Sequence, residues 1–441
     1  FVYWSSMVEG QTIFGMWMSN ASENFYRFNP ASGASGAWVG IPGSFVMQEG
    51  QGYIARARHN SNGWAVNPPG TVPWTATFTG KPRSGNVPLT LSGDRFHLLG
   101  NPYPSAVDFD TFALQEAVDY ASSPFVPTIY YWTQSTPIAG NQYNQNDYAT
   151  YNAPNGTGIT VDGFTAGRYI AAGQGFFIRT RAGATTASFT NDYRAAIDGS
   201  NQPVNQNFAK PASKQILSAN RSRYWLNLNS GAAFKQIAVV HSNLATNAYE
   251  IDYDALTFNG NTAMNFYSLV DNLNISIQGR APMQITDEVP IGYYVASAGT
   301  FSISMPQYDG IFAADQDVFL LDQLTNITHN LKIAPYTFTT TSGTHNSRFK
   351  IVYQNNPLGV NEVTENNHLT VFYQNQQIHV ESSKELLDTI QIFDIQGRRI
   401  FDKNNLSTHQ VSFEFLKNHS FYFVKVKTKS GTILSHKIVK N

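Results

Sequence analysis

The chain has 441 residues, of which 42% are hydrophobic and 14% aromatic, so it can form packed cores, and its length suits about three domains. Only 13% of the residues are charged and the net charge is −1, which argues against nucleic-acid binding because phosphate affinity needs clustered lysine and arginine. The absence of cysteine excludes disulfides, thiolate metal sites and cysteine nucleophiles.

The first 200 residues contain an internal duplication that predicts two copies of one β-unit. The matched segments are, in chain order, 2–6 with 130–134, 25–33 with 148–156, 50–54 with 173–177, and 75–83 with 186–194. Their order is kept while their separation shrinks, as changes in loop length between two copies would produce. We expect a truncated first copy over residues 1–90 and a second over residues 96–200. Since Phe1 then lies inside the first copy, we expect the chain to be a piece of a longer protein.

Each copy contains the tripeptide Gly-Gln-Gly, at residues 50–52 and 173–175, directly before a strand-like segment. Glycine is suited to a positive φ angle and to the close approach of another backbone. We therefore expect these glycines to serve one of those two purposes.

One helix is predicted, over residues 108–118 (DFDTFALQEAV), with Asp108 or Asp110 as its N-cap. Elsewhere, short alternating runs of Val, Ile, Thr, Tyr and Phe are separated by Gly, Asn and Pro. That pattern is typical of β-sandwiches and jelly rolls. The predicted fold class is all-β, with tandem β-sandwich or jelly-roll-like domains and a small Ig-like β-sandwich at the C-terminus.

Two polar segments without alternation, 201–220 and 355–368, are interpreted as linkers. They delimit a β-sandwich domain over 221–354 and a last domain over 369–441. The last domain has ten Lys plus Arg against six Asp plus Glu, a difference of +4, so its charge differs in sign from the rest of the chain.

The last domain alternates clearly. A hairpin is predicted around Asn375–Gln376 and a strand–turn–strand around Gln396–Gly397. Ile390, Ile392 and Asp394 fall on one side of their strand. In the segment 421–429, three lysines alternate with Val424, Val426 and Thr428, which predicts one wet face and one buried face.

This block resembles the C-terminal sorting domain of cargo proteins of the bacterial type IX secretion system. The shared pattern is an Ile-rich strand, the run Phe393–Arg398 (FDIQGR), an aromatic-Val-x-Val strand at Tyr422–Val426 and the closing Lys437–Lys440 (KIVK). It departs from the family in lacking the usual "PNP" opening and in having "LKNHS" where a glycine commonly precedes the Tyr strand.

The resemblance implies a secreted or cell-surface protein of a Gram-negative bacterium, exported across the outer membrane. Residues 369–441 would be the export signal, and the translocon and its shuttle proteins of the outer membrane would be the partners. The implied sorting-signal residues are Phe393, Asp394, Gly397, Arg398, Tyr422, Val424, Lys437, Ile438 and Val439.

A second resemblance, to large adhesin-like surface cargoes of such bacteria, rests on three segments. They are GNPYPSA at 100–106, AGQGFF at 172–177, and a YTF…G…RF ending made by Tyr336–Phe338, Gly343 and Arg348–Phe349. It implies a role in adhesion, with surface glycans or other cell-surface proteins as further partners.

Metal ligands are sparse. The ten histidines show no metal-binding spacing. Among the acidic pairs, the best calcium candidate is Glu250, Asp252 and Asp254, because Ca²⁺ takes six to eight oxygen ligands. We favour surface or capping roles for these carboxylates and expect no other cofactor.

Tryptophans divide into two groups. Trp4 and Trp132 occupy matching places in the two copies, which favours packing. Trp38, Trp64 and Trp74 have no counterpart in the second copy and are candidates for exposed binding contacts, for example to sugars. No motif singles out a catalytic set. The leading hypothesis is a non-catalytic, adhesin-like secreted protein, and the alternative is a carbohydrate-binding accessory region of a larger secreted enzyme.

Overall fold

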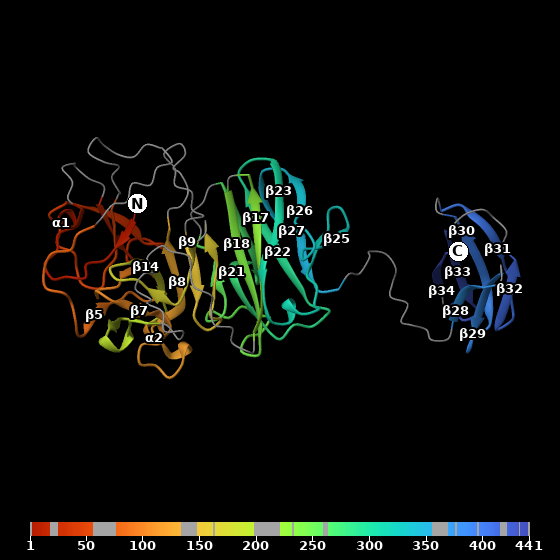
Figure 1. The fold of residues 1–441 in the computed structure, drawn as a ribbon, viewed down its shortest axis with the longest axis horizontal. Coiled ribbons are helices and arrows are strands. Elements are labelled where there is room, and N and C mark those ends of the chain that lie inside the picture. The colour runs from red at the N-terminus through yellow and green to blue at the C-terminus, as the bar shows by residue number, and fades with distance from the viewer. Residues whose placement is uncertain are drawn as a thin grey trace. The chain divides into compact units, whose positions relative to one another are not determined.

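The computed structural model describes residues 2–17, 25–55, 76–133, 148–161, 164–197, 221–231, 233–258, 263–354, 369–374, 377–394, 397–414, 421–431 and 433–439. The chain forms two compact units, residues 1–356 and 357–441, drawn in Figure 1. Its structure is nearly all β, which confirms the predicted fold class. None of the described helices is long and apolar enough to span a membrane.

Residues 2–195 form short strands with two short α-helices. The strands are β1 (Val2–Trp4), β2 (Phe25–Asn29), β3 (Ala37–Ile41), β4 (Tyr53–Ala55), β5 (Val87–Thr90), β6 (Phe96–Gly100), β7 (Ala106–Asp108), β8 (Phe125–Trp132), β9 (Tyr148–Asn152), β10 (Thr157–Gly158), β11 (Thr160–Val161), β12 (Phe164–Thr165), β13 (Tyr169–Ile170), β14 (Gly175–Thr180), β15 (Thr186–Phe189) and β16 (Arg194–Ala195). The helices are α1 (Ile13–Trp17) and α2 (Phe109–Leu114). The two larger sheets have the orders β1-β4-β2-β3 and β10-β9-β8-β14-β6.

Three of the four pairs of duplicated segments form corresponding strands, whereas residues 76–83 form no strand to match β15, and the two sheets differ in strand order. β1, β2 and β4 match β8, β9 and β14 in sequence. In the first sheet β4 lies between β1 and β2, whereas in the second β8 lies between β9 and β14. Local sequence similarity therefore reproduces the strands and not their pairing.

Both Gly-Gln-Gly segments behave as expected. Gly50 and Gly173 have φ angles of +69° and +67°. Gly52 donates its N–H to Leu98 O (3.0 Å), and a Cβ added to it would stand 2.6 Å from Leu99 O. The first glycine of each segment thus supplies a left-handed turn, and Gly52 permits a close backbone approach.

Helix α2 begins as predicted and ends earlier. The Asp108 carboxylate accepts from Asp110 N (3.1 Å), so Asp108 is the N-cap. Phe109, Phe112 and Ala113 are fully buried, and Gln115, with φ of +54°, ends the helix. Helix α1 was not predicted from sequence; there the Thr12 hydroxyl accepts from Gly15 N (3.1 Å).

Residues 221–352 form one large sheet folded around a core. Its strands are β17 (Arg221–Ser230), β18 (Ala233–Ser242), β19 (Ala255–Leu256), β20 (Met264–Val270), β21 (Leu273–Arg280), β22 (Glu288–Val295), β23 (Gly299–Tyr308), β24 (Phe319–Asp322), β25 (Ile327–Asn330), β26 (Tyr336–Thr340) and β27 (Gly343–Val352). The order is β25-β24-β27-β22-β20-β21-β18-β17-β23-β26, with β19 paired to β21. Pairing is antiparallel except between β18 and β21.

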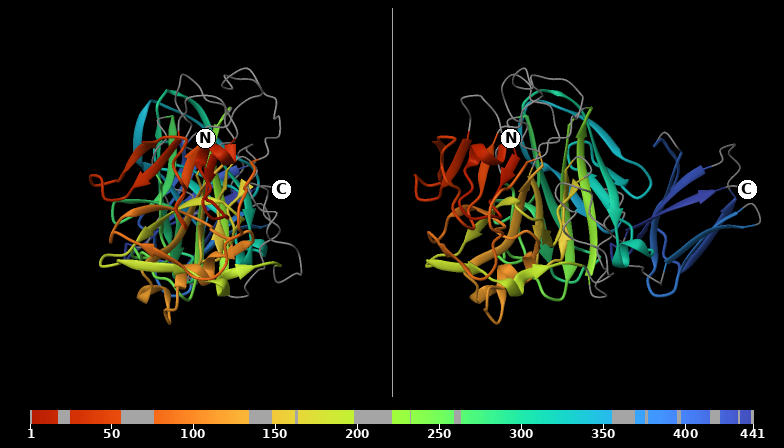
Figure 2. Two further views of the ribbon diagram at one scale, coloured as in Figure 1. Left: turned by 90° about the vertical axis from the view of Figure 1, so that its left-hand side faces the viewer. Right: turned by 60° about the vertical axis from the view of Figure 1, so that its left-hand side comes forward.

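This sheet packs on residues 2–195, so both belong to one compact unit, and Figures 1 and 2 show β9 beside β18 and β21. Arg223 donates to Gly156 O (2.9 Å) and to the Asp309 carboxylate (2.6 Å). Trp225 Nε1 donates to Gly158 O (2.8 Å). The predicted linker 201–220 lies outside the described residues, whereas the division between residues 356 and 357 falls inside the predicted linker 355–368.

The C-terminal unit is a sandwich of two sheets, β28-β29-β32 and β31-β30-β33-β34. Its strands are β28 (Leu369–Gln374), β29 (Gln377–Ser382), β30 (Leu387–Phe393), β31 (Arg399–Lys403), β32 (Gln410–Glu414), β33 (Phe421–Thr428) and β34 (Ile433–Val439). Ile390, Ile392 and Asp394 are all buried, as their shared side of the strand predicts. β28 and β29 form the predicted hairpin.

Candidate functional site

Asp394 and Gly397 build the turn between β30 and β31. The buried Asp394 carboxylate accepts from Arg398 N (3.0 Å) and from Arg398 Nε (2.7 Å). Gly397 has a φ of +74° and donates its N–H to Asp394 O (3.0 Å). An aspartate that bonds its own turn and a glycine in the left-handed region are what this turn requires. The Arg398 side chain remains largely exposed.

The other motif residues lie in β33 and β34. Tyr422 and Val424 are 2% and 0% exposed and belong to the core of the C-terminal unit. Lys437 and Ile438 stand opposite Phe423 and Tyr422 in the β33–β34 ladder, and Val439 follows in the same edge strand. Much of the implied sorting signal is therefore the framework of the sandwich.

Residues between the motif positions face outward. Phe423 is 46% exposed, and Lys425 and Lys427 are exposed, because they alternate with buried neighbours. The lysine alternation was predicted from sequence. Phe423 was missed as a site residue, although the same alternation places it on the outward side.

Among the candidate binding aromatics, Trp38 on β3 is 41% exposed. Its ring packs edge-on against Phe28 (centroids 5.2 Å apart) and Phe177 (5.8 Å). Tyr3, which also contacts Trp38, stacks on Trp132 at 5.6 Å. Trp38 is thus the exposed margin of an aromatic cluster that holds the two copies together. Trp64 and Trp74 lie outside the described residues.

The calcium candidates do not converge. Asp254 is buried and accepts from Glu250 N (2.7 Å) and Gly279 N (3.0 Å), while the Glu250 carboxylate accepts from Thr246 N (2.6 Å). Asp252 forms an ion pair with Arg181. In the part of the chain that the structure describes, no group of three or more His, Asp or Glu side chains could hold a metal ion.

Asp110, the alternative cap, has a different environment. Its carboxylate accepts from Tyr151 OH (3.0 Å) and lies 3.3 Å from Arg168 Nε, which also donates to the capping Asp108 (2.7 Å). Burial raises the pKa of Asp110 to about 7, against the opposing charge of Arg168. The carboxylate oxygens of Asp108 and Asp110 are therefore bound by Tyr151, by Arg168 and by the N-cap hydrogen bond of α2.

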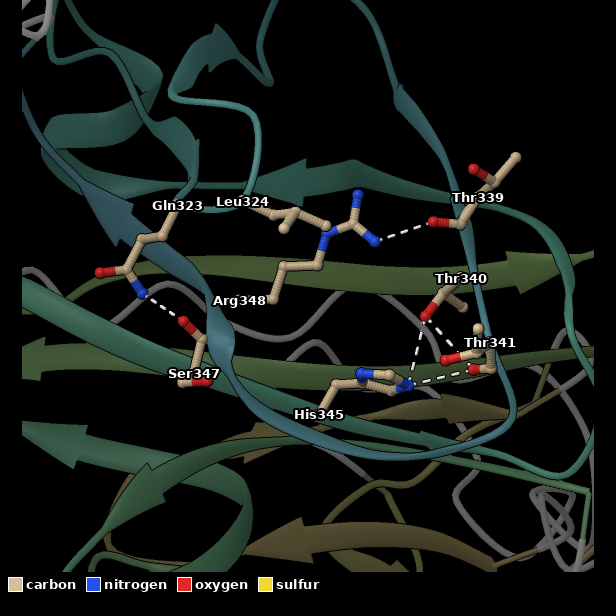
Figure 3. Close-up of a pocket in the computed structure, with 8 residues that line it drawn as sticks. All are labelled: Gln323, Leu324, Thr339, Thr340, Thr341, His345, Ser347 and Arg348. Atoms are coloured by element: carbon tan, nitrogen blue, oxygen red, sulfur yellow. Dashed lines mark hydrogen bonds between the residues drawn. The ribbon is translucent and has the colours of Figure 1, made fainter.

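A hollow of about 670 Å³ opens where edge strand β26 meets β24 and β27 (Figure 3). Arg348 lies between Leu324 and Thr339 and donates from Nη1 to Thr339 O (2.8 Å). His345 Nε2 is 3.0 Å from Thr341 O. Side chains thus bind backbone carbonyls along the hollow.

Beneath this hollow lies a buried polar network that explains the YTF…G…RF segment. Asp322, fully buried, accepts from Arg348 Nη2 (2.9 Å), Tyr336 OH (2.9 Å) and Leu324 N (3.0 Å). The Arg348 guanidinium also lies over the Phe338 ring, 4.8 Å from its centroid. The YTF…G…RF segment therefore contains the residues that surround one buried ion pair.

Comparison with known families divides the chain at the same place as the structure. Residues 1–353 match a family described as a domain of unknown function (DUF8693). The chain belongs to the DUF8693 family. Residues 358–440 match a second family, also described as a domain of unknown function (DUF8694). A search of curated proteins finds no match.

The DUF8693 region thus coincides with the first compact unit and the DUF8694 match with the second. Asp322, the hub of the buried network in the DUF8693 region, was missed from sequence. A lone aspartate at the end of a short strand carries no signal of its own, since its partners are 14 and 26 residues away.

Proposed function

We propose that this protein is a non-catalytic cargo of type IX secretion, displayed or released at the cell surface. Residues 369–441 would act as the export signal and the DUF8693 region would be the exported, adhesin-like part. The observation that supports this most is that the motif residues of the C-terminal unit occupy the positions its fold requires, in a unit that is compact by itself.

The basic charge of the last domain and its folding as a separate compact unit also support the proposal. The last domain is the basic part of a chain whose net charge is −1. A compact signal joined to its cargo by a short segment can be recognised without disturbing the cargo, as expected of a module whose partners are the translocon and its shuttle proteins.

The test is secretion of the protein by its native host with and without residues 369–441. We expect truncation to retain the protein in the cell envelope while the melting temperature of the purified DUF8693 region stays unchanged, because the two units are separately compact. Surface display of the truncated protein would contradict the export role.

A second candidate function, sugar binding by an accessory region of a larger secreted enzyme, is favoured by the exposure of Trp38 above an aromatic cluster. The substitution Trp38→Ala should abolish signals on a glycan array. An array on which the unaltered protein shows no signal would remove this candidate.

A further inference from the structure

One side of the C-terminal unit combines exposed aromatic and basic side chains. On β33, Phe423, Lys425 and Lys427 point away from the core, since Tyr422, Val424 and Val426 between them are buried. Phe423 stands opposite Phe393, which is half-buried on β30. We refer to Phe393, Phe423, Lys425 and Lys427 as the basic aromatic face.

In the β30 and β34 ladders the two lysines stand opposite uncharged residues. Within the described residues neither forms an ion pair, and their ladder partners on β30 are Gln391 and Thr389. Lys425 and Lys427 are two positions apart on one strand, so their Cα atoms are about 7 Å apart. Like charges at this spacing repel each other weakly.

Two basic residues close to this face do form ion pairs. Lys429 binds Asp388 (2.8 Å) and Arg399 binds Asp402 (2.9 Å). The hydrogen bond from Lys429, with a smaller contribution from the charge of Lys427, lowers the pKa of Asp388, so that carboxylate already has its own lysine.

The outward side of the other sheet has the opposite charge. Glu381 on β29 and Glu414 on β32 are exposed, and each stands opposite a glutamine in the β29–β32 ladder. We refer to Glu381 and Glu414 as the acidic face. Lys425 and Lys427 therefore lie on one sheet of the unit, and Glu381 and Glu414 lie on the other.

Resting on the proposed export function, we propose that the basic aromatic face is the surface by which the C-terminal unit is recognised. Its occupant is a protein surface whose carboxylates surround an apolar pocket for Phe423. A half-exposed phenylalanine can become the aromatic anchor that is buried at the centre of a protein interface. The lysines beside it, which form no ion pair within the described residues, favour a negatively charged partner. The face lies on a β-sheet, which favours a protein over a membrane because surface-bound segments insert an apolar helical face.

This assignment separates two roles within the motif. Asp394, Tyr422 and Val424 are buried and act only by maintaining the sandwich. Phe423, Lys425 and Lys427 are accessible and determine what the sandwich binds.

The experiment compares secretion of full-length variants by the native host at matched expression. Lys425→Glu/Lys427→Glu reverses the charge of the basic aromatic face, and Glu381→Lys/Glu414→Lys is the matched change on the acidic face. We expect the first to lower the exported fraction about tenfold, equivalent to about 1.4 kcal/mol of binding, and the second to leave it unchanged. Phe423→Ser should lower export comparably. Melting of each purified full-length variant monitors folding, and Lys425→Gln/Lys427→Gln decides the case if the reversed variant melts early.

The outcomes distinguish this inference from the proposed function. Normal export of all variants of the basic aromatic face, together with retention of the chain lacking 369–441, would overturn the inference and leave the export signal standing. Export of the truncated chain would overturn both. Retention of the acidic-face variant to the same extent as the basic-face variant would show that neither face is specifically recognised, which would overturn the inference. Lysine-dependent sedimentation of the purified full-length protein with phosphatidylglycerol vesicles, or lysine-dependent self-association, would replace the protein partner with a lipid or a second copy.

Discussion

The buried pair of Asp322 and Arg348 offers the sharpest test of how the DUF8693 region is stabilised. Arg348→Met would leave the Asp322 carboxylate, 0% exposed, with hydrogen bonds from Tyr336 and Leu324 but without a counter-charge. Breaking such a pair costs roughly 3–5 kcal/mol.

The assay is urea unfolding of the full chain at pH 7 for Arg348→Met, Asp322→Leu and the double variant. Since each single change leaves a buried charge, the double variant should lose at least about 2 kcal/mol less than the two losses added together. Lys350→Met is the control, because Lys350 pairs with Glu288 at 2.7 Å on the surface, where such pairs contribute less than about 1 kcal/mol. Additive losses, or an equal loss for the control, would refute the reasoning.

The contribution of the Asp322–Arg348 pair to stability depends on pH. Hydrogen bonds from Arg348, Tyr336 and Leu324 N outweigh burial and lower the pKa of Asp322. A carboxyl with a lowered folded pKa contributes stability above its unfolded pKa and loses that contribution as the pH falls through its folded pKa. In Arg348→Met, burial without the arginine should raise the folded pKa of Asp322 instead of lowering it. The stability of this variant should therefore approach that of the unaltered protein as the pH falls below about 5.

Three further predictions concern single sites. Because burial raises the pKa of Asp110 to about 7, its contribution to stability is lost as the pH rises from about 4 to 7, and Asp110→Asn should flatten that part of the melting-temperature profile. Gly52→Ala should cost about 1–3 kcal/mol, because its Cβ would meet Leu99 O at 2.6 Å, whereas Gly167→Ala, with nothing within 4 Å, should melt normally. Tyr422→Ala should destabilise the C-terminal unit by about 3–5 kcal/mol in chemical denaturation, and Phe423→Ala by less than about 1 kcal/mol; equal losses would contradict the assigned burial.

The elements that sequence predicts well are those whose signal is periodic and local. Alternation in the last domain predicted the buried side of β30, including Asp394, and the two faces of β33. The same local reasoning predicted Asp108 or Asp110 as the N-cap of α2, and in the structure the N-cap is Asp108. Period-2 alternation depends only on which side of a strand faces the core, so it needs no knowledge of partners.

Features that depend on distant partners were not predictable. The different strand orders of the two copies arise from pairing choices between segments of similar sequence. Residues 2–195 and 221–352 belong to one unit because Arg223 and Trp225 donate to carbonyls 67 residues away. Such hydrogen bonds satisfy backbone oxygens at a buried interface, and no pattern within either segment announces them.

The C-terminal unit shows why a motif and a binding surface need not coincide. A motif stands out in a sequence when the fold restricts residue type strongly, as for a glycine at positive φ or a tyrosine that fills a core. Exposed positions such as Phe423 and Lys425 are under no such restriction from the core, so in the proposed role the partner would determine their identity. If this reasoning holds, variants at Asp394, Gly397 or Tyr422 should impair export only to the extent that they unfold the unit, whereas variants at Phe423 or Lys425 should impair export in a unit that melts normally. A plot of exported fraction against melting temperature for both groups would separate the two roles, and a single common line would refute the distinction.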